Sequence, residues 1–364
     1  MTRRIDPRVG LGVCLVLAGC AAAVSSAYGA RLAEGDRAYT AGRFEDAARA
    51  YERAAVEVGA GRDADDARYR AAMACRRVGD LVCARRLLSQ VAISRGGWDH
   101  GPRARLELAS LDLASTAPTE VVSAHRALAS LVEDAPDSGP ARGALRLRLR
   151  ALDATDPTRS TAIAWLDALA ANPRIRRSIL IESVLAERAI RVEATGDRAA
   201  AEASWLAVVE QVPYPANSHW DDGHLALARL QRAAGRPRDA LATLDRMLAV
   251  REASWGNGSY AAPGFDDGAL LQAEILRDDL RDPSAAADAY HRVYAEHPTS
   301  LRRDDALWEE AALRRGSDAA RACGLWRVLV EEFPCRRFAA RARAALAGCA
   351  GGTADSGICQ ESRR

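Results

Sequence analysis

Four pairs of adjacent aspartates recur along the chain, and their carboxylates could serve in acid–base or cation chemistry. Two carboxylates held in one site can act as a general acid and a general base, or as ligands of a divalent cation. The pairs are Asp65–Asp66, Asp221–Asp222, Asp266–Asp267 and Asp304–Asp305. Because the pattern recurs, it favours a structural role in each copy of a repeat over a single catalytic site.

Two histidines flank the second of these pairs and form the one metal-like cluster of the sequence. His219 and His224 are five residues apart, a spacing that suits one helical face poorly, and no further ligand is evident. The cluster therefore favours the start of a helix over a metal site. Because no G-x-S-x-G, H-E-x-x-H or phosphate-loop pattern occurs either, the sequence predicts no enzyme, no cofactor and no metal.

The N-terminus has the order of charges and apolar residues that is typical of an export signal. Arg3, Arg4 and Arg8 precede an apolar run of eleven residues, 9–19. A helix that crosses a bilayer needs about 20 apolar residues, so the run is too short to span and fits the apolar part of a secretory signal peptide.

The signal ends in Leu17-Ala18-Gly19-Cys20, which resembles the lipobox of bacterial lipoproteins. That resemblance implies cleavage before Cys20 and a thioether-linked lipid on its sulfur. Ala21 stands where a signal for inner-membrane retention would often be Asp, so outer-membrane residence facing the periplasm is favoured. The alternative is ordinary cleavage after Ala27 or Ala30, which would discard Cys20 and leave a secreted or periplasmic soluble protein.

Past residue 30 the sequence is a helical pattern that repeats. From a small residue taken as origin, a large residue follows at +4 and an apolar or small one at +7, and these offsets share one helical face. Glycines recur five residues before the origin, where a tight turn would fall, and prolines recur twelve residues after it, where a helix would stop. The origins are Ala47, Ala84, Ala124, Thr161, Ala201, Ala240, Ala286 and Ala322; the glycines are Gly42, Gly79, Gly196 and Gly235; the prolines are Pro136, Pro173, Pro213, Pro298 and Pro334.

This arrangement resembles the tetratricopeptide repeat (TPR) over residues 31–347, with Gly35 through Ala54 as the best copy. The resemblance implies an all-α fold, an α-solenoid of about eight TPR-like helical hairpins with a capping helix at about 336–347. The chain then divides into a signal peptide (1–19), a lipidated cysteine with a short tether (20–30), the solenoid (31–347) and a cysteine-containing tail expected to be flexible (348–364). The segment Pro298–Leu307 resembles repeats of envelope lipoproteins of the BamD and CpoB (YbgF) type.

Each aspartate pair lies 17 to 20 residues before a repeat origin, at the expected start of a first helix. Carboxylates there accept hydrogen bonds from free backbone N–H groups and meet the positive end of the helix dipole. We therefore expect the pairs to cap helices.

Six cysteines remain after Cys14 leaves with the signal and Cys20 takes lipid, and an even number in an exported protein indicates disulfides. Cys75 and Cys83 flank a Gly-Asp turn almost symmetrically, so two antiparallel helices would bring them together. For the other four the preferred pairs are Cys323–Cys349 and Cys335–Cys359. The local pairs 323–335 and 349–359 stay open.

The charge outside the signal peptide is balanced, because the only excess of basic over acidic residues lies in the first 19 residues. A neutral body of this size argues against nucleic acid as a partner.

Several aromatic side chains are candidates for contact with a protein partner. Three belong to the Gly-rich segment 251–268, which lengthens one repeat, and the same residues would otherwise seal an irregular joint. Three more lie on or before first helices, which in the TPR family line the concave groove. The candidates are Trp255, Tyr260 and Phe265 in the segment, and Trp98, Trp220 and Trp308 in the repeats.

The sequence as a whole predicts a membrane-anchored periplasmic scaffold that binds envelope proteins or peptides. Its setting would be outer-membrane assembly, pilus biogenesis, or cell-wall and division coordination. The alternatives are an envelope module that binds a small ligand or glycan through the 251–268 loop, and an enzyme with its site in that loop.

Overall fold

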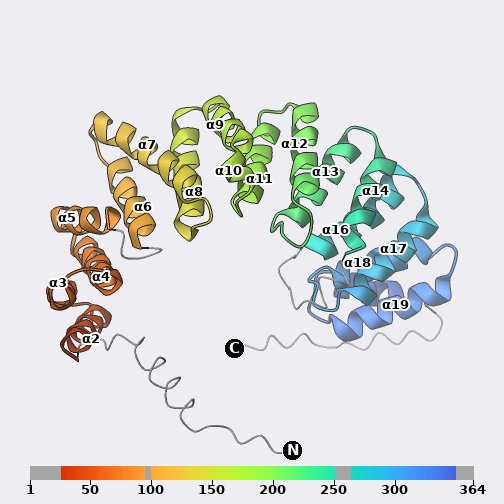
Figure 1. The fold of residues 1–364 in the computed structure, drawn as a ribbon. Helices are drawn as coiled ribbons and strands as arrows, with labels where there is room; N and C mark the ends of the chain where they lie inside the picture. The colour runs from red at the N-terminus through yellow and green to blue at the C-terminus, as the bar shows by residue number, and fades with distance from the viewer. Residues whose placement is uncertain (1–25, 95–99, 251–263, 350–364) are drawn as a thin grey trace, which may run out of the picture. The chain divides into compact units, whose positions relative to one another are not determined.

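The computed structural model describes residues 26–94, 100–250 and 264–349, and all regular structure in these ranges is helical (Figure 1). They contain 18 α-helices and one short π-helix. Consecutive helices joined by short turns pack as antiparallel pairs, so the expected all-α solenoid of helical hairpins is confirmed. The described residues include no helix that is both long and apolar enough to cross a membrane.

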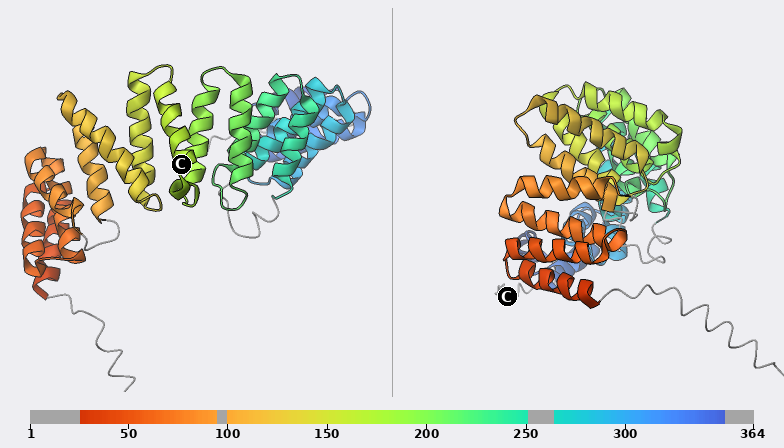
Figure 2. Two further views of the ribbon diagram at one scale, coloured as in Figure 1. Left: turned by 45° about the horizontal axis from the view of Figure 1, so that its top comes forward. Right: turned by 60° about the vertical axis from the view of Figure 1, so that its left-hand side comes forward.

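The chain forms two compact units, and the first spans residues 1–157 together with 177–180. Within it each helix packs against the next, and the helices from α2 to α5 lie side by side as successive layers (Figure 2, right). The helices are α2 (Ser26–Thr40), α3 (Phe44–Val58), α4 (Arg62–Val78), α5 (Leu81–Ala92), α6 (His100–Leu113), α7 (Pro118–Asp134) and α8 (Gly139–Thr155).

The second unit spans residues 158–176 and 181–364 and has the same construction. Its last helix packs on α19 and covers the end of the stack, as expected for a cap. The helices are α9 (Ser160–Ala171), α10 (Pro173–Arg176), α11 (Ile181–Glu193), α12 (Arg198–Gln211), α13 (Trp220–Ala233), α14 (Pro237–Leu248), α16 (Gly264–Glu274), η1 (Ile275–Asp279), α17 (Pro283–Glu296), α18 (Arg303–Arg314), α19 (Ala319–Glu332) and α20 (Ala339–Leu346).

The repeat frame read from the sequence is correct in seven of eight copies. In those seven, the residues at the origin, at +4 and at +7 are all buried, as one helical face should be. The fourth copy is wrong by one residue, because Thr161 is exposed and Trp165 is only half-buried. Ala162, Leu166 and Leu169 form the buried face of α9 instead.

The fourth hairpin differs from the others in a second way, because the boundary between the two units falls inside it. Helix α8 belongs to the first unit and α9 to the second. The connection contains Pro157 and no turn glycine, and Arg159 adopts the left-handed conformation at φ 61°. In the described ranges, α8 and α9 stand where a hairpin was expected but belong to different units.

The expected turn signals are confirmed. The four glycines at −5 all have positive φ, between 74° and 90°, which residues with a Cβ rarely adopt. Each of the five prolines at +12 follows its helix by two residues, because the residue before a proline is displaced from the helical region. Helix α2 includes residues 26–30, which the sequence had assigned to the tether.

The closest approach of two paired helices in the first hairpin is at Gly35 of α2. A Cβ at this position would lie 2.5 Å from two carbons of the Tyr51 ring on α3. That ring is held in place, since the Tyr51 hydroxyl donates a hydrogen bond of 2.7 Å to Asp36, the neighbour of Gly35 on α2. The first hairpin therefore requires a residue without a side chain at position 35.

We predict that Gly35→Ala destabilises the chain by about 1–3 kcal/mol, because the ring must move from its hydrogen bond to make room. Gly29→Ala is the matched control: Gly29 lies in the same helix, and a Cβ there meets nothing within 4 Å. Ala is about 0.5–1 kcal/mol more favourable than Gly in a helix, so the control should be stabilised. Urea denaturation measures both, and equal effects would refute the close-approach argument.

Candidate functional site

The aspartate pairs lie at the starts of α4, α13, α16 and α18, where the sequence placed them, with Asp66 just after the first turn of α4. They are not the capping residues, however. The N-cap positions of α4, α13 and α18 are Gly61, His219 and Arg302, and none makes a side-chain cap hydrogen bond. The expectation of capping by the pairs is therefore corrected for α4, α13 and α18. In α16 the Asp266 carboxylate does accept the N–H of Asp267, at 3.0 Å.

Three of the carboxylates instead accept hydrogen bonds from the start of the next repeat. The Ser94 hydroxyl donates to Asp65 at 2.5 Å, and the Ser300 hydroxyl donates to Asp266 at 2.5 Å. The backbone N–H of Gly264 donates to Asp221 at 3.2 Å. These donors lie 29 to 43 residues further along the chain. Asp65, Asp221 and Asp266 thus link their helices to segments that follow later in the chain.

The metal-like cluster does not converge on one point. His224 is buried, and its Nδ1 lies 2.7 Å from the carbonyl oxygen of Trp220, while His219 lies 3.9 Å from the exposed Asp222. Burial lowers the pKa of His224, which favours the neutral ring. Among the described residues, no group of three or more His, Cys, Asp or Glu side chains is arranged to hold a metal ion.

Two of the expected aromatic contact residues belong to the core. Trp220 packs against the rings of Tyr214 and His224, and Phe265 is buried in the same cluster. Trp308 is half-buried and stacks on Phe338, next to the capping helix, at 5.2 Å between ring centroids. The expectation that Trp220 and Phe265 face a partner is therefore corrected, whereas the prediction for the half-buried Trp308 stays a prediction.

Several other predicted residues lie outside the described ranges. They are the lipidation candidate Cys20, the aromatic candidates Trp98, Trp255 and Tyr260, and the disulfide candidate Cys359. The predictions made for them stay predictions.

Two disulfides have the connectivity preferred from the sequence. One joins Cys75 at the end of α4 to Cys83 in the first turn of α5, with a Cα–Cα distance of 5.9 Å. The other joins Cys323 of α19 to Cys349 after α20, with a Cα–Cα distance of 6.0 Å. The second bridge connects the end of the capping helix to α19. Because it uses Cys323 and Cys349, it rules out the alternative local pairs 323–335 and 349–359.

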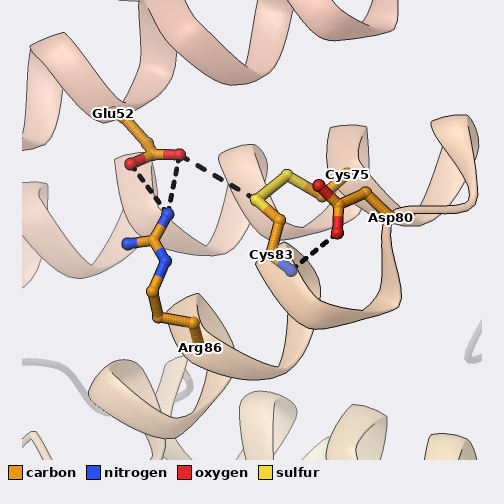
Figure 3. Close-up of a disulfide and its surroundings, with 5 residues drawn as sticks. All are labelled: Glu52, Cys75, Asp80, Cys83 and Arg86. Carbon is orange, nitrogen blue, oxygen red and sulfur yellow. Dashed lines mark hydrogen bonds and ion pairs between the residues drawn. A yellow bond between two sulfur atoms is a disulfide. The ribbon is translucent and has the colours of Figure 1, made fainter.

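The first disulfide lines a surface groove of about 540 Å³ in the first unit, which we call the disulfide groove. Figure 3 shows the bridge beside the Glu52–Arg86 ion pair. Its walls combine the disulfide, apolar side chains and charges of both signs. The lining residues are Glu45, Ala48, Arg49 and Glu52 of α3, Cys75 and Val78 of α4, and Asp80, Val82, Cys83 and Arg86 at and after the turn.

Hydrogen bonds fix the polar side of the disulfide groove. Arg86 Nη2 donates to both carboxylate oxygens of Glu52 at 3.0 Å. The Asp80 side chain accepts the Cys83 N–H at 2.9 Å and thereby caps α5. Cys83 Sγ lies 3.9 Å from Glu52 Oε1 (Figure 3). The groove is therefore a preformed surface, because Glu52, Asp80 and Arg86 already have partners.

The apolar side of the disulfide groove was missed by the sequence interpretation. Val82 is 81% exposed and Val78 is 43% exposed, although both are large apolar residues next to a turn. An available signal was the position of Val82, which directly precedes Cys83 and is off the repeat face that contains Ala84 and Leu88. Exposed apolar side chains beside a groove are typical of an interaction surface.

We predict that Asp221→Asn stabilises the chain at pH 7. Burial and, secondarily, the neighbouring Asp222 raise the pKa of Asp221, so at a pH between the unfolded and the folded pKa the folded chain binds more protons, and above both it holds a destabilised charge. Stability from this group is then lost as pH rises from the unfolded pKa through the folded one. Asn keeps an acceptor for the Gly264 N–H without the buried charge.

The expected gain from Asp221→Asn is on the order of 1 kcal/mol at pH 7, measured by urea denaturation, and it should shrink towards pH 4. Asp222→Asn should stabilise the chain less, because that side chain is 69% exposed and acts only through its repulsion of Asp221. A stability loss in Asp221→Asn at pH 7 would show that the ionised carboxylate is the stabilising form.

Comparison with known proteins assigns no family. No family model matches the chain, and no curated protein matches it. The similar solved structures include a tetratricopeptide repeat protein from Parabacteroides merdae, with 13% identity and a TM-score of 0.33, over 79% of this chain and 99% of that one. The TPR domain of P58(IPK) has 15% identity and a TM-score of 0.28, over 88% and 98%. At these values neither likeness extends beyond what the helices themselves show.

Proposed function

We propose that the chain is a protein-binding scaffold of the bacterial envelope, anchored to the outer membrane through lipid on Cys20. The observation that carries the binding role is the disulfide groove, in which exposed apolar side chains lie within a rim of fixed charges. Binding energy at protein interfaces comes from apolar anchors in desolvated pockets, and the surrounding charges select the partner. The groove offers both features without any change in the helices.

The partner is a protein because the groove is open and bordered by charges of both signs. Glu45 and Glu52 stand on the same helix as Arg49, so a protein surface with complementary charges would be selected over a uniformly charged polymer. The volume lies within the range of about 300–1,000 Å³ that ligand pockets occupy, enough for one or two side chains of a docked segment.

The envelope location is supported by the order of features at the N-terminus and by the cysteines. A basic segment, an apolar run and Leu17-Ala18-Gly19-Cys20 follow one another as in lipoprotein signals. Disulfides such as Cys75–Cys83 persist in oxidising compartments and are rare in the cytosol. The proposed settings are outer-membrane assembly, pilus biogenesis, or cell-wall and division coordination.

The test of the disulfide groove is Val82→Glu. Glu at this position adds a charge beside Glu52 and removes the most exposed apolar contact, so capture of the partner from cross-linked membranes should fall at least about tenfold. Val56→Glu is the matched control: Val56 is 80% exposed, against 81% for Val82, and does not line the groove. Capture is measured by affinity purification of the tagged chain and quantitative mass spectrometry.

Circular dichroism should show the same helix content in both variants, because neither side chain is packed. Loss of capture in Val82→Glu alone supports the groove as the binding surface. Equal capture by the two variants, or equal loss, would refute it.

The test of the anchor is Cys20→Ser, which removes the thiol that the lipid requires. We predict that the full-length chain partitions into detergent-rich membranes and that Cys20→Ser appears in the soluble periplasmic fraction, because acyl chains supply about 0.8 kcal/mol per buried CH₂. Fractionation with labelled palmitate measures both. Label retained in Cys20→Ser, or a wild-type chain without label, would contradict the proposal.

A further inference from the structure

A second groove lies wholly within the second unit, on helices α9 to α12. Its volume is about 650 Å³, which exceeds that of the disulfide groove. The end of α9 forms one side, and the faces of α11 and α12 form the other. We call it the α11 groove. It contains none of the residues that the sequence analysis selected.

The floor of the α11 groove is apolar. Ile181 and Leu185 of α11 stand four residues apart on one helical face, and they line the groove together with Ala207 of α12 and Val212, which follows α12. Leu185 is buried, whereas Ile181, Ala207 and Val212 are half-buried and so keep surface that a ligand can cover. Burying such surface contributes about 25 cal/mol per Å², so the floor favours apolar side chains.

The charged residues that line the α11 groove are both arginines. Arg188 donates to the Ser204 hydroxyl at 2.6 Å and to the Asp167 carboxylate, so its charge is balanced. Arg176 is exposed, and its guanidinium group forms no ion pair or hydrogen bond with any described residue, although its backbone N–H donates to the carbonyl oxygen of Asn172. Many arginines of the chain are paired with a carboxylate, so an unpaired guanidinium beside an apolar floor leaves a net positive charge at the mouth.

The contrast with the disulfide groove identifies the occupant. That groove has carboxylates and guanidinium groups among its lining residues, whereas the α11 groove has guanidinium groups without a lining carboxylate. A ligand that completes it must bring a carboxylate for Arg176 and apolar atoms for Ile181 and Ala207. A phosphate alone would leave the apolar floor uncovered, and an apolar segment alone would leave the guanidinium without a partner.

We propose that the α11 groove binds a short acidic and apolar peptide segment of a partner protein, with a carboxylate on Arg176 and apolar side chains on the floor. An extended peptide advances about 3.3 Å per residue and alternates its side chains between two sides. Acidic and apolar residues in alternation therefore place one kind on the floor and the other at the mouth. The inference rests on the proposed binding role but concerns a different site and ligand chemistry.

The experiment is a fluorescence-anisotropy titration of the full chain with a labelled hexapeptide of alternating leucine and aspartate. Arg176→Glu should weaken binding at least about tenfold, because it replaces attraction of the carboxylate by repulsion. Arg238→Glu is the matched control: it makes the same change of charge at an exposed arginine of α14 that does not line the groove. Ala207→Leu fills the floor without a change of charge and should also weaken binding.

Each outcome decides the proposal. Weaker peptide binding by Arg176→Glu and Ala207→Leu, but not by Arg238→Glu, supports the proposal. Weaker binding of a second hexapeptide, in which lysine replaces aspartate, supports it as well. Binding of the acidic peptide by Arg176→Glu with unchanged affinity overturns the proposal. So does the absence of binding at about 1 mM peptide, because a Kd of about 1 mM corresponds to only about 4 kcal/mol. If inorganic phosphate displaces the peptide completely, the groove is an anion site and the proposal that it binds a peptide is refuted.

The two binding tests can fail separately. Val82→Glu is read out by partner capture and alters the disulfide groove, whereas Arg176→Glu is read out by a defined peptide and alters the α11 groove. A chain that captures a partner through Val82 but ignores the peptide keeps the proposed function and loses this inference. A chain that binds the peptide but captures no partner through Val82 keeps this inference and loses the disulfide groove as the binding surface.

Discussion

The close approach of paired helices is the constraint on which the rest of the structure depends. The chain is poor in aromatic residues, at 5%, and rich in alanine, so its helices gain burial by lying close together and not by filling wide spaces with large side chains. At Gly35 even one methyl group would enter the Tyr51 ring. Ala72, Ala189 and Ala228, like Gly35, stand twelve residues before a repeat origin, and all three alanines are fully buried. The helix spacing is thus set by residues that contribute little area themselves.

Packing of small residues specifies the relative position of neighbouring helices only weakly. Polar contacts between repeats add this specificity. Flat alanine faces can slide along one another at low cost, because few side chains interlock. The hydrogen bonds from Ser94 to Asp65 and from Ser300 to Asp266 connect the beginnings of neighbouring repeats and fix their relative register. A buried carboxylate is costly unless it is hydrogen-bonded. The same groups therefore penalise every arrangement in which the donor of the next repeat is displaced.

Local features of the fold could be predicted from the sequence, and long-range ones could not. The frame at Ala47 or Ala286 follows from helical periodicity, and the turn at Gly79 follows from the conformational freedom of glycine. The fourth frame failed because Thr161 and Ala162 are both small and no turn glycine fixes the register. The aspartates were placed in the correct turn, but their donors lie in another repeat, which no local pattern reveals.

The same distinction explains why the two grooves escaped prediction while the disulfides did not. Cys75 and Cys83 belong to one hairpin, so the turn alone brings them together. A groove depends on what neighbouring helices leave uncovered, and Trp220 has the same local sequence whether it faces a partner or Tyr214.

Because stability in such repeats comes from contacts between neighbours, a side chain that faces a groove can change without loss of the stack. Val82 and Arg176 are exposed, so packing of the repeats does not require them. The Cys75–Cys83 disulfide supports the surface around Val82, and the buried Leu185 belongs to the groove that Arg176 lines. Selection on the partner can therefore act on these grooves while the helices remain under the constraint of close approach.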